Sequence, residues 1–156
     1  MTVEATHPDE RAVRDALAAI PDPELPVLSI VDLGIVHAVD VRDDAIDVAI
    51  LPTFVGCPAL DMIRMTIEEQ LTERFDRPTH VRTTFEVPWT SDRISASGRD
   101  ALQRVGIAPP ADPAEMRCPH CGSPEVVMDS AFGPTQCRSL FYCRGCRQPF
   151  EALKSV

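Results

Sequence analysis

The stretch 118–122 reads Cys-Pro-His-Cys-Gly, and a second stretch, 143–146, reads Cys-Arg-Gly-Cys. Each is a Cys-x-x-Cys knuckle, in which the chain turns back so that two thiolates can bind one ion. Glycine near each knuckle permits the left-handed backbone that lets amide groups point at sulfur. Four thiolates in a closed tetrahedron suit a structural zinc ion. We therefore predict a Zn²⁺ site formed by Cys118, Cys121, Cys143 and Cys146.

The size of the C-terminal segment supports a structural metal. About forty residues bury too little apolar surface to fold unaided. Structural zinc contributes on the order of 10–16 kcal/mol in small finger peptides, which would offset that deficit. We predict a zinc ribbon over residues 117–156. Two alternatives stay open for the four cysteines: an iron–sulfur cluster on the same ligands, and a pair of redox-active dithiols.

Two further residues of this segment carry donor atoms. Cys137 lies between the knuckles and could serve as an alternative metal ligand. The interpretation that we favour for Cys137 is a small buried residue in the hairpin. His120 lies inside the first knuckle, and we expect it at the surface because four cysteines already fill a tetrahedral shell.

The charge of the chain is strongly acidic. Its 156 residues are enough for one ordinary domain and a small appendix, and the formal net charge is −9. Phosphate backbones repel such a chain, so nucleic-acid binding is not expected. The basic residues of the C-terminal segment indicate a solvated face or a docking surface for an acidic partner; they are Arg138, Arg144, Arg147 and Lys154.

Neither a targeting segment nor a membrane span is visible. The first residues, Met1–Val13, are polar and acidic, unlike a signal peptide. No apolar run approaches the ~20 residues of a membrane helix. We expect a cytoplasmic protein that does not bind membranes. Thiols stay reduced in the cytoplasm, so the paired knuckles favour metal ligation over disulfides.

Helix and strand patterns alternate in the N-terminal part. Their periods predict helices over 9–20, 58–75 and 97–105, and strands over 35–41, 46–50 and 80–87. The segment 42–45 predicts a hairpin turn. The order is α-β-β-α-β-α, and the β-α-β part should be a right-handed crossover between parallel strands. We predict an α+β fold, in which a small mixed three-stranded sheet has helices on one face and a zinc ribbon follows.

A proline-rich segment separates the two parts. Residues 108–113 read Ala-Pro-Pro-Ala-Asp-Pro, which is typical of a stiff, extended linker. The composition changes after it, because most of the cysteines follow. We predict a domain over 1–108, a linker over 109–116 and the ribbon over 117–156.

Cys57 stands apart from the other cysteines. It precedes Pro58, which is well suited to the first position of a helix. Cys57 is therefore the expected N-cap of the long helix, where unpaired N–H groups and the helix dipole favour a thiolate and lower its pKa. Such a thiolate could bind a metal or a cluster edge, or act as a nucleophile. A buried structural cysteine is equally supported.

Acidic residues also offer candidate groups. Asp22 and Glu24 lie in a proline-fixed loop and could be metal or catalytic groups, although a solvated loop is better supported by the residues alone. Asp32, before Leu33-Gly34, is expected to be a turn or cap residue. No Ser-His-Asp order, P-loop or dinucleotide glycine pattern is found, so the common enzyme chemistries lack support.

Several of these motifs together resemble a known family. The segment 22–36, DPELPVLSIVDLGIV, and the segment 53–58, TFVGCP, resemble the iron–sulfur cluster assembly domain family that includes SufT. Three further segments narrow this resemblance to one branch of the family: PWTSD at 88–92, GIAPP at 106–110 and FGPTQCR at 132–138. With the knuckles, they resemble the PaaD (PaaJ) family of phenylacetyl-CoA epoxidase subunits over nearly the whole chain.

The resemblance implies an accessory role in aerobic phenylacetate degradation. The oxygenase of that system is a diiron enzyme, served by a reductase with flavin and an iron–sulfur cluster, and PaaD-like proteins are expected to assist maturation of an iron or iron–sulfur centre. Implied partners are oxygenase and reductase components or other iron–sulfur assembly proteins, with a homodimer left open. Implied cofactors are structural Zn²⁺ and a transient iron–sulfur cluster or iron.

The resemblance also implies roles for individual residues. Cys57 becomes the functional cysteine that contacts metal or cluster transiently, and Asp22 and Glu24 become the acidic motif of the family. No catalytic residue is expected, since the implied role is accessory. Two other functions stay open: a purely structural zinc-binding interaction subunit of the oxygenase complex, and a thiol-dependent enzyme with His37 or His80 as its base.

Overall fold

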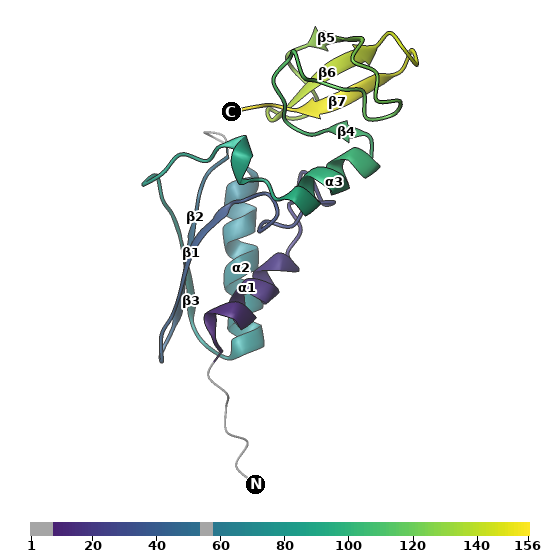
Figure 1. The fold of residues 1–156 in the computed structure, drawn as a ribbon. Coiled ribbons are helices and arrows are strands. Elements are labelled where there is room, and N and C mark those ends of the chain that lie inside the picture. Colours follow the sequence, from purple (N-terminus) through teal and green to yellow (C-terminus); the bar gives the residue numbers. More distant parts are fainter. Residues whose placement is uncertain (1–7, 54–57) are drawn as a thin grey trace.

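The computed structural model describes residues 8–53 and 58–156. These residues form two modules, each built on its own β-sheet (Figure 1). We call residues 8–106 the N-terminal module and residues 107–156 the ribbon. In the described part of the chain, no helix has the length and apolarity that crossing a membrane requires.

The N-terminal module is a mixed three-stranded sheet with helices against one face. Its elements are α1 (Glu10–Ala18), β1 (Val36–Val41), β2 (Ile46–Ile50), α2 (Ala59–Phe75), β3 (Thr79–Thr83), the 3₁₀-helix η1 (Ser91–Arg93) and α3 (Ala96–Arg104). The strand order is β1-β2-β3, with β1 antiparallel and β3 parallel to β2. Figure 1 shows α1 and α2 on the same side of the sheet. The predicted mixed sheet and element order are confirmed.

The helices form where capping and apolar spacing agree. The Asp9 side chain caps α1 by accepting a hydrogen bond from the Ala12 amide, at 2.7 Å. Helix α2 buries one side chain per turn against the sheet; these are Ala59, Ile63, Ile67 and Leu71. The resulting core is continuous between the helices and the sheet.

The third strand is shorter than predicted. Strand β3 ends at Thr83, whereas the alternating pattern predicts a strand to residue 87. The amide of Thr84 still donates to the carbonyl of Ile50 at 2.9 Å, but β2 ends there and offers no further partner. Phe85 is consequently 78% exposed. The sequence period alone could not show where the neighbouring strand stops.

The connection between α1 and β1 is a tightly bonded loop. Asp22 donates its amide to Leu28, and Ile30 donates to Ile20, at 2.8 and 3.0 Å. We call Asp22–Leu28 the acidic loop. Farther along, the Asp32 carboxylate accepts from Ser95 at 2.6 Å, and its backbone carbonyl accepts from the Ser95 amide at 2.9 Å. Asp32 therefore fixes a turn to the start of α3, as predicted.

The ribbon is a four-stranded sheet. Its strands are β4 (Ile107–Ala108), β5 (Val126–Ser130), β6 (Arg138–Cys143) and β7 (Pro149–Leu153), in the order β4-β7-β6-β5. Strand β4 runs parallel to β7, and the other pairs are antiparallel. The rings of Phe141 and Phe150 stack at 5.6 Å in a small separate core.

The two modules are held together by side-chain packing and hydrogen bonds as well as by the continuous chain. Leu153 and Cys137 of the ribbon belong to the hydrophobic core of the N-terminal module. The amide of Ser91 donates to the carbonyl of Val156 at 3.1 Å. The guanidinium of Arg99 donates to the carbonyls of Ser91 and Pro110, at 2.8 and 3.1 Å. The ribbon is thus fastened to the N-terminal module by apolar burial and by hydrogen bonds.

Candidate metal centre and acidic pocket

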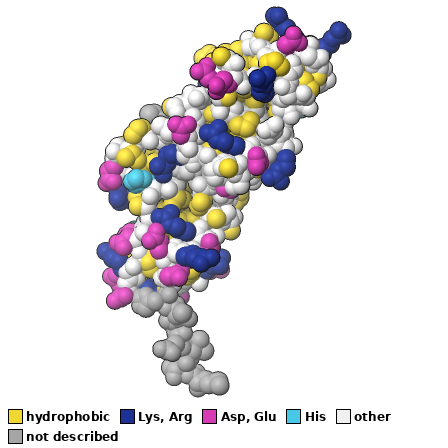
Figure 2. Space-filling model, in the orientation of Figure 1, with side chains coloured by type: hydrophobic (Ala, Val, Ile, Leu, Met, Phe, Trp, Pro, Cys, Tyr) yellow, Lys and Arg dark blue, Asp and Glu magenta, His cyan; other side chains and the backbone are white. Residues whose placement is uncertain are grey.

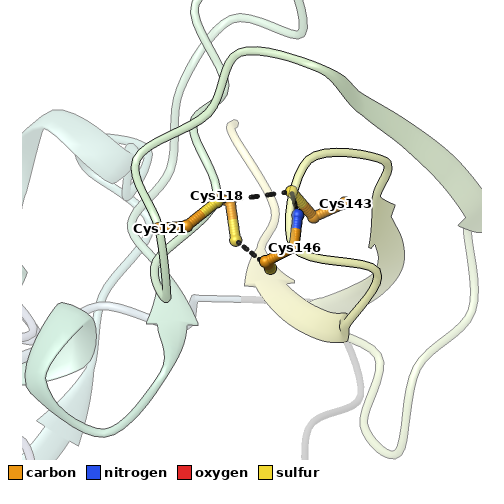
Figure 3. Close-up of side chains that lie close together, drawn as sticks. All are labelled: Cys118, Cys121, Cys143 and Cys146. Atoms are coloured by element: carbon orange, nitrogen blue, oxygen red, sulfur yellow. Dashed lines mark hydrogen bonds between the residues drawn. The ribbon is translucent and has the colours of Figure 1, made fainter.

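Four cysteine side chains converge at one end of the ribbon (Figure 3). Cys118 and Cys121 come from the connection between β4 and β5, Cys143 ends β6, and Cys146 lies between β6 and β7. The Sγ atoms of Cys118 and Cys146 are 3.7 Å apart, and those of Cys121 and Cys143 are 3.6 Å apart. All four Sγ atoms lie within 4.8 Å of one another.

This arrangement fits a tetrahedral metal ion. A Zn–S bond of about 2.3 Å implies an S···S edge of roughly 3.8 Å in a regular tetrahedron. The Cys118–Cys146 and Cys121–Cys143 separations match that edge closely, and the other pairs lie within 4.8 Å. A set of four thiolates also matches the donor preference of zinc. The ribbon can therefore bind one metal ion, and its geometry suits Zn²⁺.

The backbone supports both knuckles, by different means. The amide of His120 points at the sulfur of Cys118, at 3.4 Å, and Gly122 takes the predicted left-handed conformation, with φ +74°. In the second knuckle that conformation falls on Arg147, with φ +60°, and not on the glycine. Gly145 is needed for space, because a Cβ there would lie 2.9 Å from the Cβ of Ser123.

The electrostatics of the four thiols favour a bound cation. The amide of Cys146 donates to the sulfur of Cys143, at 3.5 Å, and lowers the pKa of Cys143 to about 7. Burial and the neighbouring sulfurs raise the pKa of Cys146 to about 12. One thiolate thus forms readily while another resists ionisation, and a bound metal ion would remove this conflict.

The fifth described cysteine lies elsewhere. Cys137 is outside the group of four and packs in the core of the N-terminal module. Its sulfur is 3.0 Å from the hydroxyl oxygen of Thr135. The structure therefore places Cys137 at the boundary of the modules, apart from the ribbon cysteines.

The acidic loop holds a buried carboxyl group. Asp22 is 5% exposed, and its Oδ1 accepts from the amides of Glu24 and Leu25, at 3.0 and 2.8 Å. Burial raises the pKa of Asp22, against the lowering effect of these amides and of the Arg138 guanidinium. The structure thus shows Asp22 in a buried turn and not in a solvated loop.

Asp22 and Glu24 line a pocket between the two modules. The pocket is small, with a cavity volume of about 30 Å³, and is mainly apolar, with Leu25, Leu60 and Trp89 among its walls. Cys137 and Leu153 of the ribbon also line it. Thr53 and Ala59 border it as well, and they stand on either side of the segment that holds Cys57. Cys57 itself lies outside the described residues, but α2 begins at Ala59 with Pro58 as its N-cap, so the predicted N-cap position of Cys57 is wrong by one residue.

Arg138 is the residue that sequence reasoning missed. We interpreted it as one of several solvated basic residues, but its side chain is only 14% exposed. It donates to the Glu151 carboxylate, at 2.7 Å, and to the backbone carbonyl of Glu24 in the acidic loop. The partner in the N-terminal module is a distant backbone oxygen, for which the sequence carries no signal.

Charges of both signs are spread over the molecule. On the face drawn in Figure 2, basic and acidic side chains alternate across both modules, without a continuous basic surface. Lys154 lies 5.5 Å over the ring of Phe132. The basic residues of the ribbon are therefore divided between buried, aromatic and exposed positions.

Comparisons with known proteins find a separate likeness for each of the two modules. The family model described as iron-sulfur cluster assembly protein matches residues 10–77, and that of the PaaD zinc beta ribbon domain matches residues 104–154. A domain of unknown function from Bacillus anthracis has a TM-score of 0.56 and 27% identity, covering 60% of this chain and 90% of its own. A conserved hypothetical protein from Thermotoga maritima has a TM-score of 0.51 and 30% identity, covering 61% and 94%.

Two curated relatives extend the comparison. The D component of the putative 1,2-phenylacetyl-CoA epoxidase of Escherichia coli K12 is 37% identical over 147 residues, which are 90% of this chain and 89% of the relative. The Fe-S protein maturation auxiliary factor YitW of Bacillus subtilis 168 is 33% identical over 92 residues, which are 58% of this chain and 89% of the relative.

Fold and site together define the class: an iron–sulfur assembly domain that carries a four-cysteine ribbon. The likeness to the Escherichia coli epoxidase component spans both parts. The chain belongs to the PaaD family of phenylacetyl-CoA epoxidase subunits.

Proposed function

We propose that this protein is an accessory factor of a phenylacetyl-CoA epoxidase system and assists maturation of an iron or iron–sulfur centre there. The observation that carries the proposal is the joint likeness: a relative over 90% of the chain is a putative epoxidase subunit, and a relative over 58% of the chain is an Fe-S protein maturation auxiliary factor. The partners would be oxygenase or reductase components or other assembly proteins, in the reducing cytoplasm where free thiolates persist.

The proposed division of labour follows the two modules. The ribbon cysteines would hold Zn²⁺ for structure, since their shell is closed and leaves no open position. Cys57 would contact iron or a cluster transiently. Asp22 and Glu24, which line the pocket beside Thr53 and Ala59, would shape the place where that contact occurs.

Cell assays of the client test this proposal. Cys57→Ala should leave the protein folded and its ribbon metal in place, but should lower the iron content and activity of the co-expressed oxygenase or reductase. Cys137→Ala, which changes a thiol that also lines the pocket, is the matched control. Full iron loading of both clients in cells that carry only Cys57→Ala would contradict the proposal.

A structural interaction subunit is the second candidate. The observation in its favour is the firm junction between the modules, because Leu153 and Cys137 complete the core of the N-terminal module. This role predicts stable co-purification with the oxygenase complex that Cys57→Ala does not change. Failure to bind any component of that complex would exclude it.

A further inference from the structure

The acidic loop contacts the ribbon at one buried arginine. Arg138 begins strand β6, which ends at the metal-binding residue Cys143. One terminal nitrogen of its guanidinium donates to the Glu24 carbonyl, and the other donates to Glu151 of β7, at 2.7 Å. Arginine suits this task because its planar fork can bind two acceptors at once.

The surroundings hold this arginine in place. In the described part of the chain, its Nε is buried without a hydrogen-bond partner, a cost that the two other bonds must offset. The amide of Gly133 donates to the Arg138 carbonyl at 2.9 Å, and a Cβ on Gly133 would lie 3.0 Å from that carbonyl group. The hairpin loop before β6 therefore packs closely against the backbone of Arg138 and is hydrogen-bonded to it.

The contact between Arg138 and the acidic loop also places a cation near the buried carboxyl group of Asp22. The charged or titratable groups that face the buried Asp22 are Glu24 of the same loop, and Cys137 and Arg138 of the ribbon, with Glu151 behind the guanidinium. Arg138 is the only cation among these described groups. It thus opposes the burial that disfavours the Asp22 carboxylate.

We propose that Arg138 is a positioning residue, which fixes the acidic loop against the ribbon and makes the placement of Asp22 and Glu24 depend on the metal-bound state of the ribbon. Metal binding orders the end of β6 at Cys143. The ordered strands β6 and β7 then fix the side chain of Arg138, which holds the acidic loop by its hydrogen bond to the Glu24 carbonyl. The candidate site is then built by both modules. Its relevance to iron handling rests on the proposed function, but the placement of the loop does not.

Amide exchange in the purified full chain tests the inference. The Leu25 amide reports on the loop because it donates to Asp22 Oδ1. In Arg138→Met, with one metal per chain retained, we expect the amide of Leu25 to exchange about tenfold faster than in the wild type. A factor of this size corresponds to the loss of roughly one charge-assisted hydrogen bond. The carboxyl carbon signal of Asp22 should also titrate at a higher pH than in the wild type.

Two further proteins keep the test decisive. Arg138→Lys retains the charge but lacks the fork, so Asp22 should titrate near its wild-type pH while Leu25 exchanges at an intermediate rate; this variant replaces the Met variant should the latter fail to fold. Arg144→Met, which changes an exposed arginine of the ribbon, should alter neither reading. Removal of the metal from the wild type by a chelator should speed exchange at Leu25 as Arg138→Met does.

The outcomes separate this inference from the proposed function. Unchanged Leu25 exchange and Asp22 titration in a folded, metal-loaded Arg138 variant would overturn the positioning role. Unchanged Leu25 exchange after metal removal would overturn its dependence on the ribbon metal. Neither measurement involves a client, so each can fail while the iron content of the client still responds to Cys57→Ala, and the reverse.

Discussion

At the scale of single residues, burial changes what an acidic side chain contributes. Asp22 looks like an ordinary loop carboxylate in the sequence, yet the folded chain holds it almost entirely out of water. Its raised pKa means that the folded state favours the protonated form. The stability that Asp22 provides is therefore present at low pH and is lost as the pH rises from its ordinary pKa of 3.8 through its folded-state pKa.

This sign leads to the first prediction. Asp22→Asn keeps an Oδ1 that accepts the Glu24 and Leu25 amides but stays neutral at every pH. The free energy of unfolding of the variant, relative to the wild type, should increase between about pH 4 and pH 7. Urea denaturation at the two pH values measures it. Asp40→Asn, on the exposed face of β1, controls for the loss of one charge; an equal pH trend in both variants would refute the explanation.

The second prediction concerns a glycine with no room for a side chain. Gly34 has φ +76°, and a Cβ there would lie 2.5 Å from the Cβ of Arg93. Gly34→Ala should lower the free energy of unfolding by more than about 2 kcal/mol, through left-handed strain and overpacking together. Gly122→Ala, where φ is +74° with nothing within 4 Å, should cost only about 1–2 kcal/mol. Equal losses in the two variants would show that space at Gly34 is unimportant.

At the scale of elements, the ribbon depends on its metal more than on its core. The apolar cluster of the ribbon has few members, and two of them, Cys118 and Cys143, belong to the group that could hold the ion. Such a cluster cannot offset the entropy of ordering four strands. The metal and the strand pairs β5–β6 and β6–β7 should therefore form together.

The third prediction tests this coupling. Cys121→Ser should reduce metal content well below one ion per chain and weaken amide protection in β5, β6 and β7, because the tetrahedral shell loses a thiolate. Elemental analysis and hydrogen exchange measure the two effects. Cys137→Ser lies outside the group of four and should retain a full complement of metal. Loss of metal in Cys137→Ser would instead make Cys137 a ligand.

Local patterns predicted the elements, while contacts between distant segments set their details. Spacing in one segment was enough for α1, α2 and the order of helices and strands along the chain, and knuckle spacing was enough for the four cysteines. The end of β3 depends on where β2 stops, and the burial of Arg138 depends on a carbonyl in another module. No local period encodes such partners.

At the scale of the whole molecule, the two modules share one core. Leu153, in β7, is 3% exposed and packs with the N-terminal module, although it lies at the far end of the chain. Ser91 and Arg99 add hydrogen bonds across the same boundary. We therefore expect the modules to unfold together, although the ribbon begins with the proline-rich residues 108–113.

The fourth prediction follows from this shared core. The only tryptophan, Trp89, is buried in the N-terminal module and reports its unfolding by fluorescence, whereas metal release reports the ribbon. The two signals should coincide in urea. Leu153→Ala should lower the midpoint of both, at a cost of about 2–5 kcal/mol. Val127→Ala, on the exposed face of the ribbon, should leave both unchanged; two separate transitions in the wild type would disprove the shared core.

Strand order has a last consequence, for the chain as it is synthesised. Strand β7 is the final strand along the sequence, yet it lies between β4 and β6 and carries Leu153. A ribosome releases the chain from its N-terminus onward. The ribbon sheet and the core of the N-terminal module therefore stay incomplete until residues 149–153 emerge. A chain that stops short of β7 would leave an apolar gap in the N-terminal module and an unpaired β4. Incomplete translation products that lack β7 would thus expose apolar surface and an unpaired strand edge, the two features that make partly folded chains prone to aggregate.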